Sequence, residues 1–162
     1  MMQIKILGII VVFVMTVAIG MVFADSYRRE ARRMRSFLRL IAFIRTQIGS
    51  FHAPLEEIYC KFEDKDSEIR AFLSVMKEKG FESATGETLT DLNLSGITCS
   101  TLREFAAGLG KSDAADQVKR CELCEAVLAE ELRRSEEALP GKIRVCRALT
   151  VSIAVMTAIL LI

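Results

Sequence analysis

Two cysteines one helical turn apart, Cys121 and Cys124, are the residues of this chain whose types and spacing most resemble a chemical site. A Cys-x-x-Cys pair in a loop can bind zinc together with a second pair, and at a helix start it can carry out redox chemistry. The sequence contains no second pair, and its only histidine, His52, is isolated. Since Cys121 and Cys124 fall on the buried face of a predicted long helix, we interpret both thiols as small packing residues.

Motifs of the common enzyme classes are missing from the sequence. It contains no phosphate-binding glycine loop, no nucleophile elbow and no paired histidines. Carboxylates are numerous, but nothing in their spacing places two of them together in a dry cleft. We therefore predict a non-enzymatic protein with no catalytic residue, no cofactor and no metal site. The acidic stretch Glu56–Asp66 fits a solvated face or, as a second hypothesis, a surface for a basic partner.

Arginine is concentrated in residues 25–45, which contain seven arginines and two acids. Such a cluster could bind nucleic acid, but it lacks interleaved aromatic residues for base stacking. It directly follows an apolar segment, where arginine holds a loop on the cytoplasmic side and contacts anionic lipid headgroups. We therefore expect no nucleic acid partner. The residues assigned to topology and the lipid interface are Arg28, Arg29, Arg32 and Arg33.

Apolar segments begin and end the chain, in keeping with an apolar content of 51% and a positive mean hydropathy. Ile6–Ala24 holds nineteen residues without a charge. At about 1.5 Å per residue it is about 28 Å long, close to the hydrocarbon thickness of a bilayer. Ala148–Ile162 is shorter, so the predicted helix also includes the residues just before it. We predict transmembrane helices at residues 4–24 and 146–162, with residues 25–145 in the cytoplasm.

The first apolar segment has a second interpretation as a cleaved signal peptide. Val22-Phe23-Ala24 has the small-residue pattern that a signal peptidase accepts. However, the apolar run is longer than the usual about 7–15 residues of a signal peptide, and the arginines after it would have to cross the membrane. We favour a retained helix, although the sequence leaves cleavage open.

Residues 25–145 are predicted to form an antiparallel bundle of five to six helices, so the fold class is all-α with two flanking transmembrane helices. From Tyr27 to Ile48 the apolar residues recur at steps of three and four, which is typical of a packed helix. Asp66 is predicted to cap a helix that ends at Gly80. Residues 81–97 are poorly patterned. Thr101–Glu104 fits a capping box, and Ser112 or Asp113 is expected to cap a long final helix.

Two short motifs resemble the stage III sporulation protein AB family of endospore-forming bacteria. Phe105–Asp113 followed by Gln117 is similar to that family's F-G-x-x-L-G-x-S-D…Q, and Ile48–Leu55 is similar to I-x-Y-G-x-T-P-L. The chain departs from these patterns at Ser50-Phe51, Ala53 and Ala106. The residues that match, and that the resemblance implies to be structural, are Pro54, Leu55, Phe105, Leu109, Gly110, Ser112, Asp113 and Gln117.

The resemblance implies a platform in the membrane complex that links mother cell and forespore. The family's soluble domain is similar to the cytoplasmic domains of the type II secretion inner-membrane platform protein. Expected partners are other stage III sporulation complex membrane proteins, a secretion-type ATPase and membrane lipid. The expected location is the cell membrane, with two passes and the domain facing the mother-cell cytoplasm. Two alternatives stay open: a membrane-bound thiol or metal sensor using Cys121 and Cys124, and a generic adaptor bound to anionic lipid.

Overall fold

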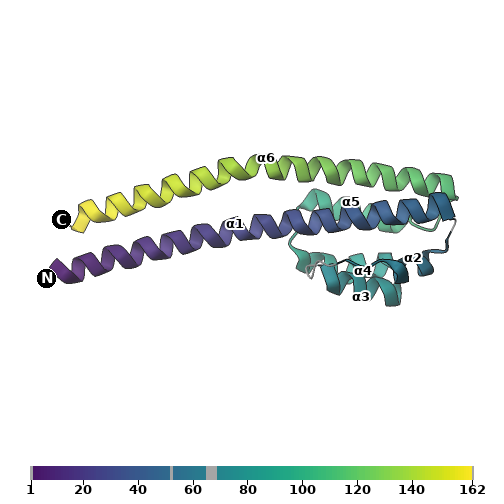
Figure 1. Ribbon diagram of the computed structural model, residues 1–162, viewed down its shortest axis with the longest axis horizontal. Coiled ribbons are helices and arrows are strands. Elements are labelled where there is room, and N and C mark those ends of the chain that lie inside the picture. The colour runs from purple at the N-terminus through teal and green to yellow at the C-terminus, as the bar shows by residue number, and fades with distance from the viewer. Residues whose placement is uncertain (1, 52, 65–68, 162) are drawn as a thin grey trace. The chain divides into compact units, whose positions relative to one another are not determined.

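The computed structural model describes residues 2–51, 53–64 and 69–161, and gives the backbone alone for residues 2–13 and 16–24 and for most of residues 142–161 (Figure 1). In this part of the chain there are six α-helices and no strand, so the predicted all-α class and helix number are confirmed. The helices are α1 (Met2–Thr46), α2 (Leu55–Lys61), α3 (Arg70–Lys79), α4 (Phe81–Thr88), α5 (Gly96–Gly108) and α6 (Ala114–Leu161).

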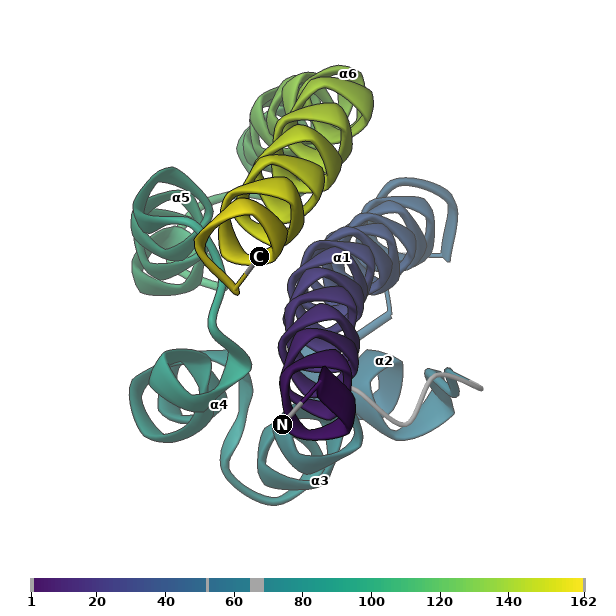
Figure 2. The ribbon, with the colours of Figure 1, turned by 90° about the vertical axis from the view of Figure 1, so that its left-hand side faces the viewer.

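The chain divides into two units, residues 1–28 with 135–162 and residues 29–134. The first unit consists of the beginning of α1 and the end of α6. These two segments run in opposite directions, and both termini lie at the same end of the unit (Figure 2). No helical stretch with described side chains is long and apolar enough to cross a bilayer. The predicted transmembrane segments, residues 4–24 and 146–162, lie largely outside the residues for which side chains are described.

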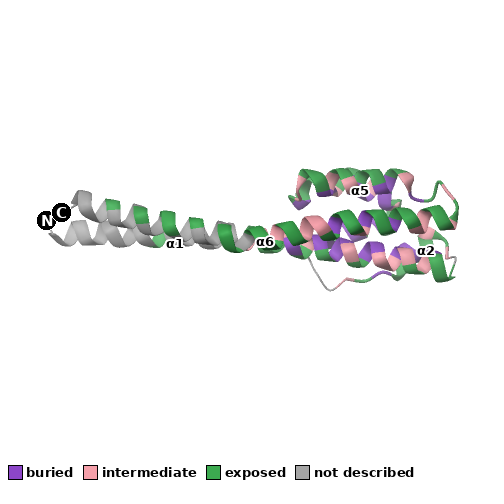
Figure 3. Ribbon diagram, turned by 90° about the horizontal axis from the view of Figure 1, so that it is seen from above, coloured by how far each residue is buried: buried purple, intermediate pink, exposed green. Residues whose placement is uncertain are grey.

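The second unit is built around one hydrophobic core to which every helix contributes. The buried face of α1 includes Met34, Phe37, Leu40 and Ile41, which are all fully or almost fully buried. Figure 3 shows the buried residues gathered on the inward faces of the helices. Four phenylalanine rings, Phe37, Phe72, Phe81 and Phe105, pack in sequence from α1 through α3 and α4 to α5.

Adjacent rings in this row meet edge to face. The centroid distances are 4.9 Å from Phe37 to Phe72, 5.3 Å from Phe72 to Phe81 and 5.4 Å from Phe81 to Phe105, with interplanar angles of 79°, 78° and 82°. Such pairs add about 0.5–1.5 kcal/mol each beyond the burial of their area. The row therefore joins helices that are far apart in the sequence into one core.

Several helix ends differ from the sequence predictions. The capping box at Thr101–Glu104 is wrong, because α5 already begins at Gly96 and Ser95 Oγ accepts the Thr98 N–H at 3.2 Å. The sequence did not predict Ser95 as the N-cap, because a serine without an acid three residues later is a weak capping signal. Residues 81–97 contain α4 and a 3₁₀ turn, η3 (Leu89–Leu92). Burial of side chains from both elements stabilises this segment, although its sequence has only a weak helical pattern.

Other predicted ends are confirmed. Asp113 caps α6, and Gly80 ends α3 with φ of +87°, a conformation that glycine adopts without strain. A π-helix, η1 (Gln47–Phe51), directly follows α1. Asp66, the predicted cap of α3, lies outside the described residues. Pro140 lies within α6, which continues on both sides of it.

Replacement of Phe72 by alanine is expected to lower the free energy of unfolding by about 3–5 kcal/mol, because it leaves a cavity and removes two ring contacts. Urea unfolding of the purified full-length chain measures this. The matched control is Phe51→Ala, since the Phe51 side chain is 68% exposed and its loss should change stability by less than about 0.5 kcal/mol. Equal effects of the two variants would show that the aromatic row does not stabilise the fold.

Candidate interaction surface

The family-motif residues meet at the end of the second unit where α1 ends and α6 begins. Gly110, in the turn between α5 and α6, has φ of +79°. A Cβ atom at this position would lie 2.9 Å from Leu55 Cδ1 at the start of α2. Pro54 precedes that helix with φ of −65° and ψ of 146°. Pro54, Leu55 and Gly110 line one shallow groove together with Gln117. The two motifs, distant in the sequence, therefore form one packing contact.

The start of α6 is held by hydrogen bonds within the second motif. Asp113 Oδ1 accepts the Asp116 N–H at 2.9 Å, which satisfies a free donor of the first helical turn. Gln117 Nε2 donates to the Ser112 carbonyl oxygen at 2.7 Å. Ser112 Oγ and Gln117 Oε1 are buried without a hydrogen-bond partner in the described part of the chain. These contacts give Ser112, Asp113 and Gln117 roles in turn formation.

The other motif residues belong to the core. Phe105 ends the aromatic row, and Leu109 is buried where α5 ends. The side chains of both motifs thus pack in the core or take part in the turn before α6. None of these side chains forms a cluster of potential metal ligands in the described residues.

The arginines after the first apolar segment are not equivalent. Arg28, Arg29 and Arg32 are exposed, whereas Arg33 is half-buried and donates to the Leu92 carbonyl oxygen in η3. Farther along α1, Arg39 Nη2 lies 2.8 Å from Asp64 Oδ2 and also donates to Ser36 Oγ at 2.8 Å. Arg33 and Arg39 therefore connect α1 to other parts of its unit, which the sequence pattern did not reveal.

The acidic stretch Glu56–Asp66 is partly neutralised within the chain. Asp64 pairs with Arg39, and Glu57 Oε1 lies 2.6 Å from Lys61 Nζ. Glu56 and Glu63 are exposed and form no ion pair with another described residue. Of the four described acids in the stretch, two are therefore paired within the chain and two face solvent.

Cys121 and Cys124 are buried on the inner face of α6 and form no disulfide. Burial raises the pKa of the Cys121 thiol to about 11 and that of Cys124 to about 12, and nearby acids add to both shifts. A thiol must lose its proton to attack a disulfide or bind a metal. Their environment therefore favours packing over reactivity.

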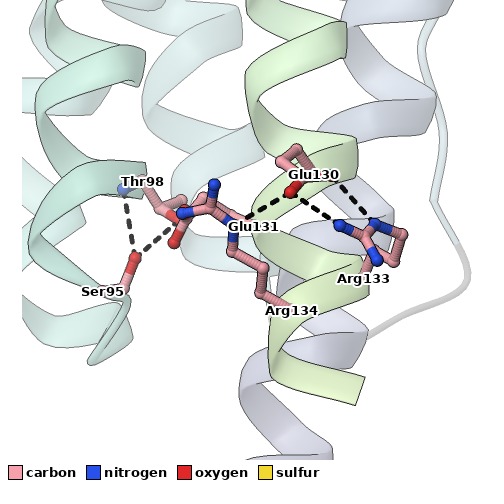
Figure 4. Close-up of polar contacts among 6 residues, drawn as sticks. All are labelled: Ser95, Thr98, Glu130, Glu131, Arg133 and Arg134. Atoms are coloured by element: carbon pink, nitrogen blue, oxygen red, sulfur yellow. Dashed lines mark hydrogen bonds and ion pairs between the residues drawn. The ribbon is translucent and has the colours of Figure 1, made fainter. Parts of the chain in front are cut away.

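The outward side of α6 carries a charge cluster that the sequence analysis did not identify. Glu130 accepts hydrogen bonds from Arg133 at 2.8 and 2.9 Å and from Arg134 at 2.9 Å (Figure 4). These arginines lower the pKa of the Glu130 carboxyl to about 2. Toward the other end of the unit, Arg45 on α1 lies 3.3 Å from Glu125 and 3.7 Å from Glu122. These ion pairs orient the charged side chains of α6. Because Glu130 and Arg134 are four residues apart on one helix, the sequence alone could have predicted their pair.

The sequence pattern also did not predict the exposed apolar residues on α5 and α6. Ile97, Leu123 and Val127 are 51%, 61% and 40% exposed, and a groove between the two helices contains Leu123 and Val127. The sequence signal was limited to Leu123 and Val127, two apolar residues four positions apart on a face of α6 other than the buried one. Together with the groove at Pro54, this face is a candidate surface for partners.

Replacement of Gly110 by alanine is expected to lower the free energy of unfolding by about 1–3 kcal/mol, because a side chain at this φ is strained and would press on Leu55. Thermal or urea unfolding of the full chain measures the loss. Gly86→Ala in α4 is the control, since no atom lies within 4 Å of its added Cβ, and it should stabilise by about 0.5–1 kcal/mol. A neutral Gly110→Ala would contradict the packing contact.

Site-resolved alkylation at pH 8 is expected to modify the exposed Cys60 in the native chain and to spare Cys121 and Cys124 until it unfolds. Both folded thiol pKa values lie above that of a free thiol, about 8.5. The stability that these thiols contribute is therefore complete below about pH 8.5 and is lost as the pH rises toward their folded values. Faster alkylation of Cys121 or Cys124 than of Cys60 would favour the thiol-sensor alternative.

Comparison with known proteins bears on the family resemblance. A family model described as stage III sporulation protein AB matches residues 5–162. Neither the curated proteins nor the solved structures that were searched contain a match. The matched range covers nearly the whole chain, including both motifs that meet at Gly110 and both apolar ends. On this ground, the chain belongs to the stage III sporulation protein AB family.

Proposed function

We propose that this chain is a non-enzymatic membrane platform of the stage III sporulation complex, which docks a secretion-type ATPase on the helical unit of residues 29–134. Membership of the family supports a role in stage III of sporulation, and it is the observation on which the proposal depends. The remaining steps concern how the chain is held at the membrane and what its helical unit offers to a partner.

Membrane anchoring is supported by the two apolar ends, which belong to the same helices as the core of the second unit. Residues 4–24 belong to α1, and residues 146–161 belong to α6. Exposed Arg28, Arg29 and Arg32 follow the first apolar segment, in the position that favours the cytoplasm.

A platform role is supported by the side-chain chemistry of the second unit. Its polar contacts cap helices and close turns, as Ser95 and Asp113 do, and the thiols of Cys121 and Cys124 are buried. Helix faces with exposed apolar residues suit the binding of another protein. The partners in this proposal are the ATPase, other membrane proteins of the complex and lipid.

The topology can be tested with Cys60, which is exposed on α2. In intact cells a membrane-impermeant maleimide is expected to leave Cys60 of the full-length chain unmodified, and in inside-out vesicles it should react, because the second unit faces the cytoplasm. The chain should also stay in the membrane fraction after an alkaline carbonate wash. Labelling in intact cells, or release by carbonate, would refute the two-pass anchor.

Replacement of arginines can distinguish the platform hypothesis from that of a lipid-bound adaptor. Replacing Arg28, Arg29, Arg32 and Arg33 with glutamine should disturb the orientation of the chain, whereas replacing the paired Arg133 and Arg134 should not. If the first variant merely releases the chain from anionic vesicles, the adaptor is the better hypothesis.

A further inference from the structure

The second unit exposes four large apolar side chains with described positions, and two of them, Leu123 and Val127, lie one turn apart on α6. Both line a groove between α5 and α6. They lie on a face of α6 other than the one that packs in the bundle, whose buried residues are Cys121, Cys124 and Leu128. Single apolar residues are normal on a surface, whereas adjacent ones on one helix face are typical of contact with a second helix.

Charged residues continue this row in both directions along α6. Residues at steps of 4, 3, 4, 3 and 4 form one seam, which we call the outer seam: Asp116, Arg120, Leu123, Val127, Glu130 and Arg134. The spacing averages about 3.5 residues, the repeat of a helix that packs along another helix. Asp116 and Arg120 are exposed and form no ion pair with another described residue. Glu130 and Arg134 pair with each other, yet their side chains stay 41% and 63% exposed, so a further charge can reach them.

The order of charges along the outer seam reverses from one end to the other. From its start the seam reads acid, base, apolar, and from its end it reads base, acid, apolar. Two copies of α6 that run in opposite directions therefore place Asp116 beside the other copy's Arg134. Arg120 then lies beside the other copy's Glu130, and the two apolar residues of each copy meet at the centre. Each contact occurs twice, as in an interface with two-fold symmetry.

The same seam disfavours two helices that run in the same direction. That arrangement brings each residue to its own counterpart, so that Asp116 meets Asp116 and Arg120 meets Arg120. Like charges then face each other at all four charged positions of the seam. Such contacts oppose association and suppress the wrong arrangement. The charges of this chain alone therefore select the antiparallel direction.

We propose that the outer seam of α6 binds the outer seam of a second copy of this chain, with the two helices antiparallel and a two-fold axis at the level of Glu125. The contact removes Leu123 and Val127 of both copies from water. Ala126 and Ala129 lie exposed beside the seam, and their small size lets the helices approach closely. The inference does not rest on the proposed function, because the outer seam lies within the second unit, residues 29–134.

Antiparallel pairing makes a demand on chains that share a bilayer. Two such chains can pair through the outer seam only if both long helices bend between the second unit and the apolar ends. In α6 this interval contains Pro140, whose missing N–H weakens the helix at that point. Purified chains in detergent micelles have no such restriction, so they test the seam independently of the proposed anchor.

Sedimentation equilibrium of the purified full-length chain in detergent micelles measures the association. The unmodified chain is expected to form a dimer whose share rises with concentration. The double variant Leu123→Ser, Val127→Ser should dimerise at least about tenfold more weakly, because both side chains are lost from both copies. Phe51→Ser is the matched control, since Phe51 is 68% exposed and lies outside the outer seam. It should leave the dissociation constant unchanged.

Charge reversal tests the direction of the helices. Arg120→Glu and Glu130→Lys should each weaken the dimer about fivefold at low salt and less at high salt, because each change places like charges together twice. The chain that carries both changes should dimerise within about twofold of the unmodified chain, since the reversed residues again pair acid with base. Lys77→Glu is the control for net charge, because Lys77 is exposed on α3.

Restoration of the dimer by the combined charge variant would support the antiparallel seam. A combined variant that dimerises no better than either single variant would refute it. The inference also fails if the chain is monomeric, which would leave the outer seam to a different protein, or if the seam variants leave the dimer intact, which would assign the association to another part of the chain. The carbonate wash tests the platform separately. Circular dichroism should show the same helix content in all variants, because every changed side chain is exposed or half-exposed.

Discussion

The second unit depends on one row of edge-to-face aromatic contacts. Phe37, Phe72, Phe81 and Phe105 come from four helices, and each ring touches the next. α3 and α4 have ten and eight residues, so neither would be stable as an isolated helix in water. Their helical state therefore follows from burial of Phe72 and Phe81 against α1 and α5. The long helices supply a surface, and the rings hold the short helices on it.

A second constraint is the contact between Gly110 and Leu55. The turn before α6 requires the positive φ that glycine adopts easily, and the space above Gly110 is filled by Leu55. This contact couples the turn between α5 and α6 to the start of α2. It explains why two motifs about fifty residues apart in the sequence carry one structural role. Residues of both motifs then give the unit a defined end, at which α6 begins.

The charged residues of the unit fall into two groups. Arg33, Arg39 and Arg45 each contact another helix or loop of their unit and help to orient α1. Exposed charges such as Arg120 and Glu104 form no ion pair with another residue of the described chain.

The sequence by itself determined the all-α class, the helix seams, the caps at Gly80 and Asp113, and the family. The class, the seams and the caps each depend on residues within one or two turns of one another, which a local pattern records. Only the tertiary structure decided that residues 81–88 are helical, that Ser95 caps α5 and that Leu55 lies on Gly110. It also decided which face of α6 remains exposed at Leu123. These features depend on burial between distant segments, and no local pattern contains that information.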